Sequence, residues 1–154
     1  MSLFNVFKIS TQGMTAQRER LEAASANLAN SNTTRTPAGG PYRRRDTIFE
    51  AIPIEEPGEG FGAAFGRSLF DDRLEHLEGV QITSQLADPN EAIRRYEPSH
   101  PDADAGGYVA LPNVDPLEET VNILSAARSF EANATAFNTA KELARASLRL
   151  GEGG

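Results

Sequence analysis

The only two histidines of the chain, His76 and His100, are its first candidates for metal binding or acid–base chemistry. His100 stands near two carboxylates, Asp102 and Asp104, in a proline-containing stretch. Zinc sites draw their ligands from His and Cys at short spacings, and this stretch offers neither a second histidine nor a cysteine. A calcium loop starting at Asp102 would need a bidentate glutamate where Asn113 stands. We therefore expect no metal site.

Other short motifs fail in similar ways. The glycines between 58 and 62 match part of a dinucleotide-binding turn, but the third glycine is replaced by Ala63 or Phe65. The run Arg43-Arg44-Arg45 could bind phosphate, although three arginines beside a strand are more typical of a solvated face or a subunit contact. Adjacent acids such as Glu118-Glu119 point in different directions and make a poor acid–base pair. We expect no enzyme activity and no cofactor.

Length and composition favour a single ordinary domain, or a modest core with helical extensions. The chain has 154 residues, of which 39% are hydrophobic and 24% charged, and it has no cysteine.

No apolar run approaches the roughly 20 residues of a membrane span, so we expect no direct membrane insertion. The first eight residues lack a basic leader followed by an apolar core, which predicts no cleaved signal peptide. A net charge of −7 argues against nucleic acid as a partner.

Apolar residues with helical spacing mark the N-terminal part of the chain. Residues 3–30 carry a large apolar residue every seven positions, namely Phe7, Met14, Leu21 and Leu28. This pattern predicts a helix with an imperfect coiled-coil seam. Such a helix cannot bury its own stripe, so it needs a partner helix or other copies of the chain.

A longer helix is predicted over residues 116–150. Asp115 is the expected N-cap, Pro116 suits the first helical position, and Glu118 stands at the capping-box spacing. Apolar residues then follow at steps of three and four, and the large ones are Ile123, Phe130, Phe137 and Leu148. We predict that these four, together with the four large residues of the first helix, form the contacts of an assembly.

Between the helices the sequence predicts turns and short strands. Strands are expected over 42–54, 80–86, 93–96 and 108–111, with the third pairing with the second. A glycine-rich mobile loop is expected over 57–66 and a brief helix over Asp71–Leu77.

The expected fold is therefore mainly α with a small β insert, in which the long N- and C-terminal helices form a coiled-coil-like core. The expected units are an N-terminal helix within 1–34, a β-rich insert within 35–111 that has a mobile loop near 55–79, and a C-terminal helix within 112–154.

Three stretches resemble proteins of the flagellar rod and hook family. Residues 24–33, ASANLANSNT, are similar to the Asn-rich signature of its axial members. Residues 96–115 resemble specifically the proximal rod proteins, and residues 125–141, SAARSFEANATAFNTAK, resemble the C-terminal helix signature. The region 55–79 departs from the family pattern. The residues that carry the resemblance are Asn27, Leu28, Asn30, Pro98, His100, Pro101, Tyr108, Asn113, Asn133 and Asn138.

The resemblance implies a structural subunit of the proximal rod in the bacterial flagellar basal body. Such a subunit is exported through the flagellar type III apparatus and joins copies of itself and other rod proteins in the periplasm. The resulting tube transmits torque and conducts later subunits. Two alternatives remain open from the residues: another axial component of the rod or hook, or an unrelated helical adaptor that binds a protein partner.

Overall fold

The computed structural model of the chain describes residues 3–53 and 78–152. Its elements are α1 (Leu3–Ala29), β1 (Arg45–Pro53), β2 (Glu78–Ala87), β3 (Ile93–Tyr96), β4 (Tyr108–Leu111) and α3 (Pro116–Glu152). The predicted pair of long helices around a small β insert is confirmed. The predicted glycine-rich loop at 57–66 and the brief helix at Asp71–Leu77 lie outside the described residues.

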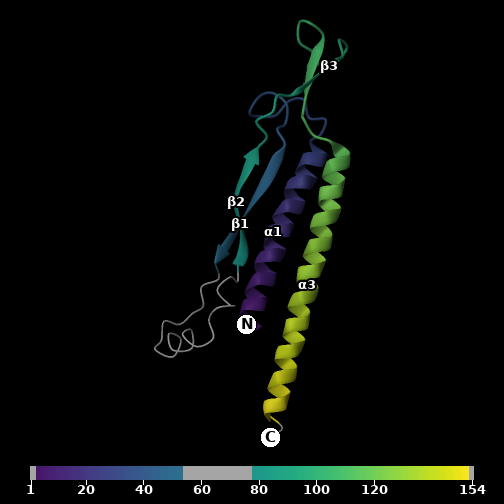
Figure 1. Cartoon of the computed structure of the whole chain (residues 1–154). Coiled ribbons are helices and arrows are strands. Elements are labelled where there is room, and N and C mark those ends of the chain that lie inside the picture. Colours follow the sequence, from purple (N-terminus) through teal and green to yellow (C-terminus); the bar gives the residue numbers. More distant parts are fainter. Residues whose placement is uncertain (1–2, 54–77, 153–154) are drawn as a thin grey trace.

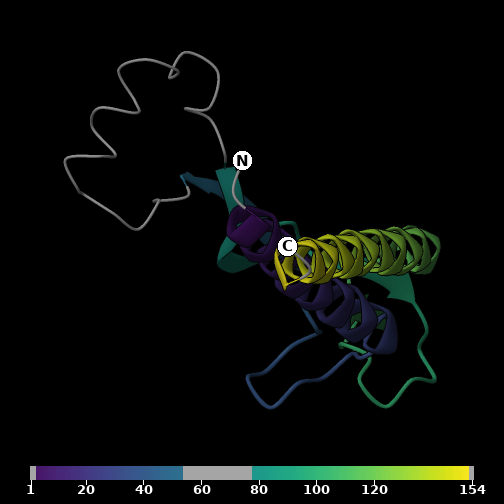
Figure 2. The ribbon, with the colours of Figure 1, turned by 90° about the horizontal axis from the view of Figure 1, so that it is seen from below.

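Helix α1 is the central element of the fold. Figure 1 shows α3 running antiparallel along one side of α1, the β1–β2 hairpin along another, and the β3–β4 hairpin projecting beyond the helix ends. Figure 2, seen from below, also places α1 between the β1–β2 strands and the C-terminal part of α3. In the part of the chain that the structure describes, no helix has an apolar stretch long enough to cross a membrane.

Local side-chain bonds fix the ends of both helices. Asp115 Oδ1 accepts a hydrogen bond of 2.9 Å from the Leu117 N–H, which confirms the predicted N-cap of α3. At the end of α1, Asn30 Nδ2 donates to the Ala26 carbonyl at 2.9 Å. Asn30 thereby satisfies one of the carbonyls that a helix leaves free at its C-terminus.

Small side chains form the seam between α1 and α3. The buried apolar residues of the two helices are Ala16, Ala23, Ala24, Ala126 and Ala140, and of these Ala16 lines a pocket against β1 and β2. The helices approach so closely that a Cβ added at Gly13 would lie 2.7 Å from Asn133 Nδ2. The larger heptad residues of α1 are only half-buried and flank this seam. Close backbone approach, more than interlocked leucines, therefore holds the two helices together.

The strands form two separate antiparallel hairpins. β1 pairs with β2, with a bulge between Ile48 and Phe49, and β3 pairs with β4. The predicted pairing of 93–96 with 80–86 is therefore wrong. The turn at Asp88, whose Oδ1 accepts the Asn90 N–H at 2.8 Å, leads the chain away from β2. Beyond it, the Glu97 N–H bonds to the Gly107 carbonyl at 2.9 Å and closes β3 onto β4.

Gly13→Leu is expected to destabilise the chain by about 1–3 kcal/mol, because the added side chain forces the helices apart at Asn133. Leucine favours a helix over glycine by up to about 1 kcal/mol, so any net loss reports the clash between the helices. Thermal unfolding followed by circular dichroism measures the change. The matched control is Lys8→Leu at an exposed position of the same helix, which should be close to neutral. Equal stability of the two variants would contradict the close approach.

Candidate assembly interface

A buried amide, Asn27, organises the end of the molecule where α1 stops. Its side chain is 1% exposed. Nδ2 donates to the Arg45 carbonyl at 2.9 Å and to Glu119 Oε2 at 3.3 Å. Oδ1 accepts the Arg45 N–H at 2.9 Å and the Tyr42 hydroxyl at 2.9 Å. Two donated and two accepted bonds saturate the amide.

Glu119 brings a buried charge to the same place. It too is 1% exposed, and its Oε1 accepts a 2.6 Å hydrogen bond from Arg44 Nε. The same guanidinium reaches Asp46 at 2.7 Å and Glu118 at 3.1 Å. Asn27, Tyr42, Arg44 and Glu119, with the Arg45 backbone, are called the polar hub below. Arg44 neutralises a carboxylate that would be costly to bury alone.

Charge and burial set the protonation states in the polar hub. Partial burial by itself lowers the pKa of Arg44. The hydrogen bond and charge of Glu119, with the charges of Asp46 and Glu118, outweigh this and leave that pKa above its ordinary value. Burial raises the pKa of Tyr42, and the Glu119 charge adds to the rise against the opposing charge of Arg45. Tyr42 therefore keeps the proton that it donates to Asn27.

The projecting β3–β4 hairpin is also held by internal bonds. The rings of Tyr96 and Tyr108 pack edge to face with their centroids 5.3 Å apart. The hydrogen bond from the Tyr108 N–H, together with that from the Gly106 N–H, lowers the pKa of Asp104 despite some desolvation. The Thr34 hydroxyl donates to Asp102 Oδ2 at 2.7 Å and ties the hairpin loop to the connector after α1.

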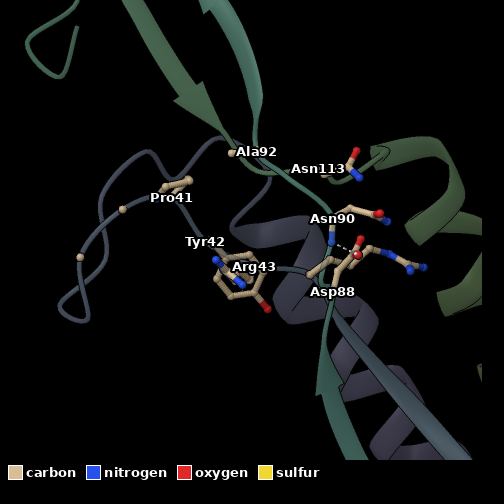
Figure 3. Close-up of a pocket in the computed structure, with 10 residues that line it drawn as sticks. Pro41, Tyr42, Arg43, Asp88, Asn90, Ala92 and Asn113 are labelled. Carbon is tan, nitrogen blue, oxygen red and sulfur yellow. Dashed lines mark hydrogen bonds between the residues drawn. The ribbon is translucent and has the colours of Figure 1, made fainter. Parts of the chain in front are cut away.

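A small polar pocket of about 160 Å³ lies where the connector meets the start of β3 (Figure 3). Figure 3 shows Asn113 at its rim and the Asn90 N–H bonded to Asp88. Among the described residues, no group of three or more His, Asp or Glu is placed to hold a metal ion. The pocket offers no constellation for catalysis.

The predicted assembly residues do not gather in one place. Phe7 and Phe137 pack on each other, edge to face, with ring centroids 5.0 Å apart. Phe130 and Leu148 are 38% and 70% exposed and share one face of α3, five turns apart. The remaining four are half-buried, namely Met14, Leu21, Leu28 and Ile123.

A second apolar surface lies on the face of α3 that points away from α1. Leu117, Val121 and Leu124 are 73%, 58% and 57% exposed and follow the i, i+4, i+7 spacing of one helix face. They are called the outer patch below. Sequence reasoning missed these three residues, although their spacing was visible, because the stripe beginning at Ile123 is longer.

Helix α3 is longer than its partner. Because the helices are antiparallel with Phe7 opposite Phe137, the described start of α1 at Leu3 lies near position 141. Residues 143–152, called the overhang below, therefore extend about 15 Å past α1 (Figure 1). Leu143 is 58% exposed there.

Comparison with known proteins identifies the family of this chain. A family described as "Flagella basal body rod protein" matches residues 7–35, and one described as "Flagellar basal body rod FlgEFG protein C-terminal" matches residues 105–150. The flagellar basal-body rod protein FlgC of Borreliella burgdorferi is 39% identical over 99% of this chain and all of its own length. The FlgC proteins of Bacillus subtilis and Salmonella typhimurium are each 36% identical with the same coverage.

The chain belongs to the FlgC family of flagellar basal-body rod proteins. It is a structural subunit of the rod and not an enzyme. The two matched segments correspond to α1 with its C-terminal cap and to β4 with α3. Asn27 lies in the first segment and Glu119 in the second, so the hydrogen bond between them links the two segments that the family descriptions match.

The structure places each of the resemblance residues that lie on the helices. Asn27 is the centre of the polar hub and Asn30 caps α1. Asn133 packs against Gly13 in the helix seam, and Asn138 is exposed on α3. Leu28 is half-buried beside the seam.

The remaining resemblance residues lie around the projecting hairpin. Tyr108 packs on Tyr96, and His100 Nδ1 accepts the Asp102 N–H at 3.1 Å. The other three are exposed, namely Pro98, Pro101 and Asn113. The structure does not bring the hairpin residues and the helix residues into one site.

The sequence did not reveal the roles of Arg44 and Glu119. The run 43–45 was interpreted as a solvated face or a subunit contact, but the Arg44 side chain is only 16% exposed. Glu119 was considered as one of two adjacent acids, whereas it is buried. Glu118 accepts a bond from Arg44 Nη2. Pattern reasoning fails here because neighbouring residues of equal charge differ only in the direction they face.

Glu119→Ala is expected to destabilise the chain by about 3–5 kcal/mol, because it leaves Arg44 and Asn27 without their buried partner. The matched control is Glu118→Ala, which removes a neighbouring carboxylate that also contacts Arg44 but is 61% exposed. That change should cost less than about 1 kcal/mol. Urea denaturation of both variants measures the difference, and equal losses would refute the hub as the source of stability.

Acid is expected to loosen the β3–β4 loop. Because the folded pKa of Asp104 lies below its ordinary 3.8, the carboxylate stabilises the loop above pH 3.8, and this contribution is lost as pH falls through the folded value. The Gly106 and Tyr108 amide resonances, followed by NMR during acid titration, should move with a midpoint below 3.8. Asp104→Asn should abolish the transition. A midpoint above 3.8 would contradict the assignment.

Proposed function

We propose that this rod subunit occupies the proximal rod, where α1 and α3 form the wall of a tube and the insert within 35–111 lies outside it. In this arrangement the helices within 1–34 and 112–154 form a coiled-coil-like core and pack against neighbouring subunits. Neighbours are copies of the chain and other rod proteins. The tube transmits torque and conducts exported subunits.

One observation carries this proposal. The contact within the chain uses small residues, whereas large apolar residues of α3 remain exposed. Such residues in a subunit of a rod are suited to contacts between subunits, because burying each one removes apolar surface from water. Contacts between different faces of like subunits generate helical growth when the rotation does not close.

We further propose that the chain reaches the periplasm through the flagellar type III export apparatus, without a cleaved signal peptide. Family membership supports this route. The small-residue seam also suits it, since few large side chains must interlock when the helices pair after export.

Phe130→Asp is expected to abolish motility, because assembly would bury an unpaired charge at a cost of several kcal/mol. Phe130 is 38% exposed in the single chain, so the purified variant should keep its circular dichroism spectrum. Swimming in soft agar and the amount of the chain in isolated basal bodies measure the effect.

The matched control is Phe130→Leu, which keeps an apolar side chain and should swim. Normal motility of the aspartate variant would remove Phe130 from the tube-wall contacts. Absence of the unmodified chain from basal bodies would instead overturn its place in the rod.

A further inference from the structure

We propose that the outer edge of β2 over residues 84–87 receives an extended segment of another rod protein, which adds a third strand to the β1–β2 hairpin. This inference rests on the proposed function and names the partner of one surface within it. The edge over 84–87 is called the free edge below. It is separate from the outer patch and the overhang, which belong to α3.

The pairing of the hairpin shows which way its backbone groups point. The Asp88 N–H donates to the Arg44 carbonyl at 2.7 Å, across the hairpin. The next pair, Arg45 and Ala87, therefore turns its N–H and carbonyl groups away from the partner strand. Arg45 agrees with this, because both of its groups bond to the side chain of Asn27 on α1. Asn27 thus occupies the outer edge of β1 as an added strand would.

The corresponding groups of β2 stay open. Ala87 presents its N–H and carbonyl on the opposite edge of the hairpin, and so does Gln85, because backbone direction alternates along a strand. Within residues 3–53 and 78–152, no hydrogen bond reaches Ala87 from outside the hairpin, and the sheet has two strands. Ala87 is exposed. In Figure 1 the end of β2 lies on the side of β1 that is away from α1.

The free edge lacks the features by which soluble proteins protect their strand edges. Residues 79–87 contain no charged residue and no proline, although 24% of the chain is charged. By contrast, β1 carries Arg45, Asp46 and Glu50, and β3 has two arginines among its four residues. An open and uncharged edge is a template for pairing with another chain.

The other hairpin closes its own edge. Asp104 Oδ1 accepts the Tyr108 N–H at 2.9 Å, and the Asp104 N–H donates to the Tyr108 carbonyl at 2.8 Å. Asp104 therefore blocks the outer edge of β4 as Asn27 blocks that of β1. Of the described strands, β2 is the one whose edge is neither blocked in this way nor charged, so a second copy offers no matching open strand.

Two free edges are not expected to pair with each other. Such a pair uses the same surface on both subunits and turns one of them by half a turn relative to the other. Neighbours in the wall of a tube are related by smaller rotations. The occupant is therefore a segment of a different rod protein, bound through main-chain hydrogen bonds.

A bulge sets the length of the added segment. The register gives Ile48 the partner Ser84 and Phe49 the partner Ile82, so Thr83 is an extra residue that interrupts the regular edge. At its other end the free edge stops at the turn that follows β2. About four residues remain, which is enough for one short strand.

Side chains beside the free edge define the chemistry of that segment. Leu86 and Ile48 are 54% and 40% exposed, and the register places them on one face of the hairpin. Apolar side chains at alternate positions of the segment would cover both of them. A charged residue there would lose water against an uncharged strand, so the segment is uncharged.

Hydrogen exchange tests the added strand directly. In the free chain the N–H groups of Gln85 and Ala87 should exchange fast, whereas those of Leu86 and Asp88, which face β1, should exchange slowly. Within isolated basal bodies all four should be protected, and exchange at Ala87 should slow by at least about ten-fold. Unchanged exchange at Gln85 and Ala87, in basal bodies that contain the chain, would overturn the proposal.

Ala87→Pro removes the outward N–H but leaves the bonds to β1, so the purified variant should unfold at nearly the same temperature as the unmodified chain. Its incorporation into basal bodies should fall by about ten-fold, because the added segment loses a hydrogen bond. The matched control, Ala87→Val, keeps the N–H and should incorporate normally. Normal incorporation of a folded proline variant contradicts the added strand, and the exchange measurement decides the matter if that variant does not fold.

Photocrosslinking identifies the occupant. Photoreactive benzoylphenylalanine replaces Leu86, cells are irradiated, and the adducts in isolated basal bodies are identified by mass spectrometry. We expect an adduct with a different rod protein, at about ten-fold the yield obtained from the exposed Gln81 on the other side of the bulge.

The adducts separate the possible failures. A dimer of the chain, or no adduct in basal bodies that contain the chain, overturns the proposed occupant and leaves the proposed function intact. Absence of the unmodified chain from basal bodies overturns the proposed function itself.

Discussion

The carboxylate of Glu119, buried against Asn27 and Arg44, is the interaction on which the arrangement of the chain depends. It lies in the first turn of α3, Asn27 lies in the last turns of α1, and Arg44 immediately precedes β1. Three segments far apart in the sequence therefore meet at one charge. A buried carboxylate is tolerated only when its partners are in place, so this site sets the direction in which α3 leaves the insert.

The helix seam extends the order that the polar hub establishes. From the hub, α3 returns along α1 through Ala126, Asn133 and Ala140, spaced seven residues apart. The edge-to-face contact of Phe7 and Phe137 ends the seam. Since small residues fill this interface, the large apolar residues are left on other faces, where a rod subunit can present them to its neighbours.

Much of the fold was predictable from residue patterns. Seven-residue and three-four spacing located both helices, Asp115 identified the start of α3, and short runs of β-prone residues between turns located the strands. The partner of β3 was not predictable, because strand patterns fix which residues face one way but not which strand pairs with which. Arg44 and Glu119 escaped notice for a related reason: charged residues are usually solvated, and only the three-dimensional approach of Asn27 makes these two internal.

The polar hub makes one end of α3 stiff, and we expect the opposite end, which extends past the described start of α1, to be compliant. Near the polar hub, hydrogen bonds from three segments hold α3 in place, whereas the seam of alanine and glycine presents shallow ridges that slide with little repacking. A tilt of about 5° around the hub moves the far end of this 37-residue helix by about 5 Å. We expect the far end of α3 to follow differences in curvature between neighbouring positions while the end at the polar hub stays in place.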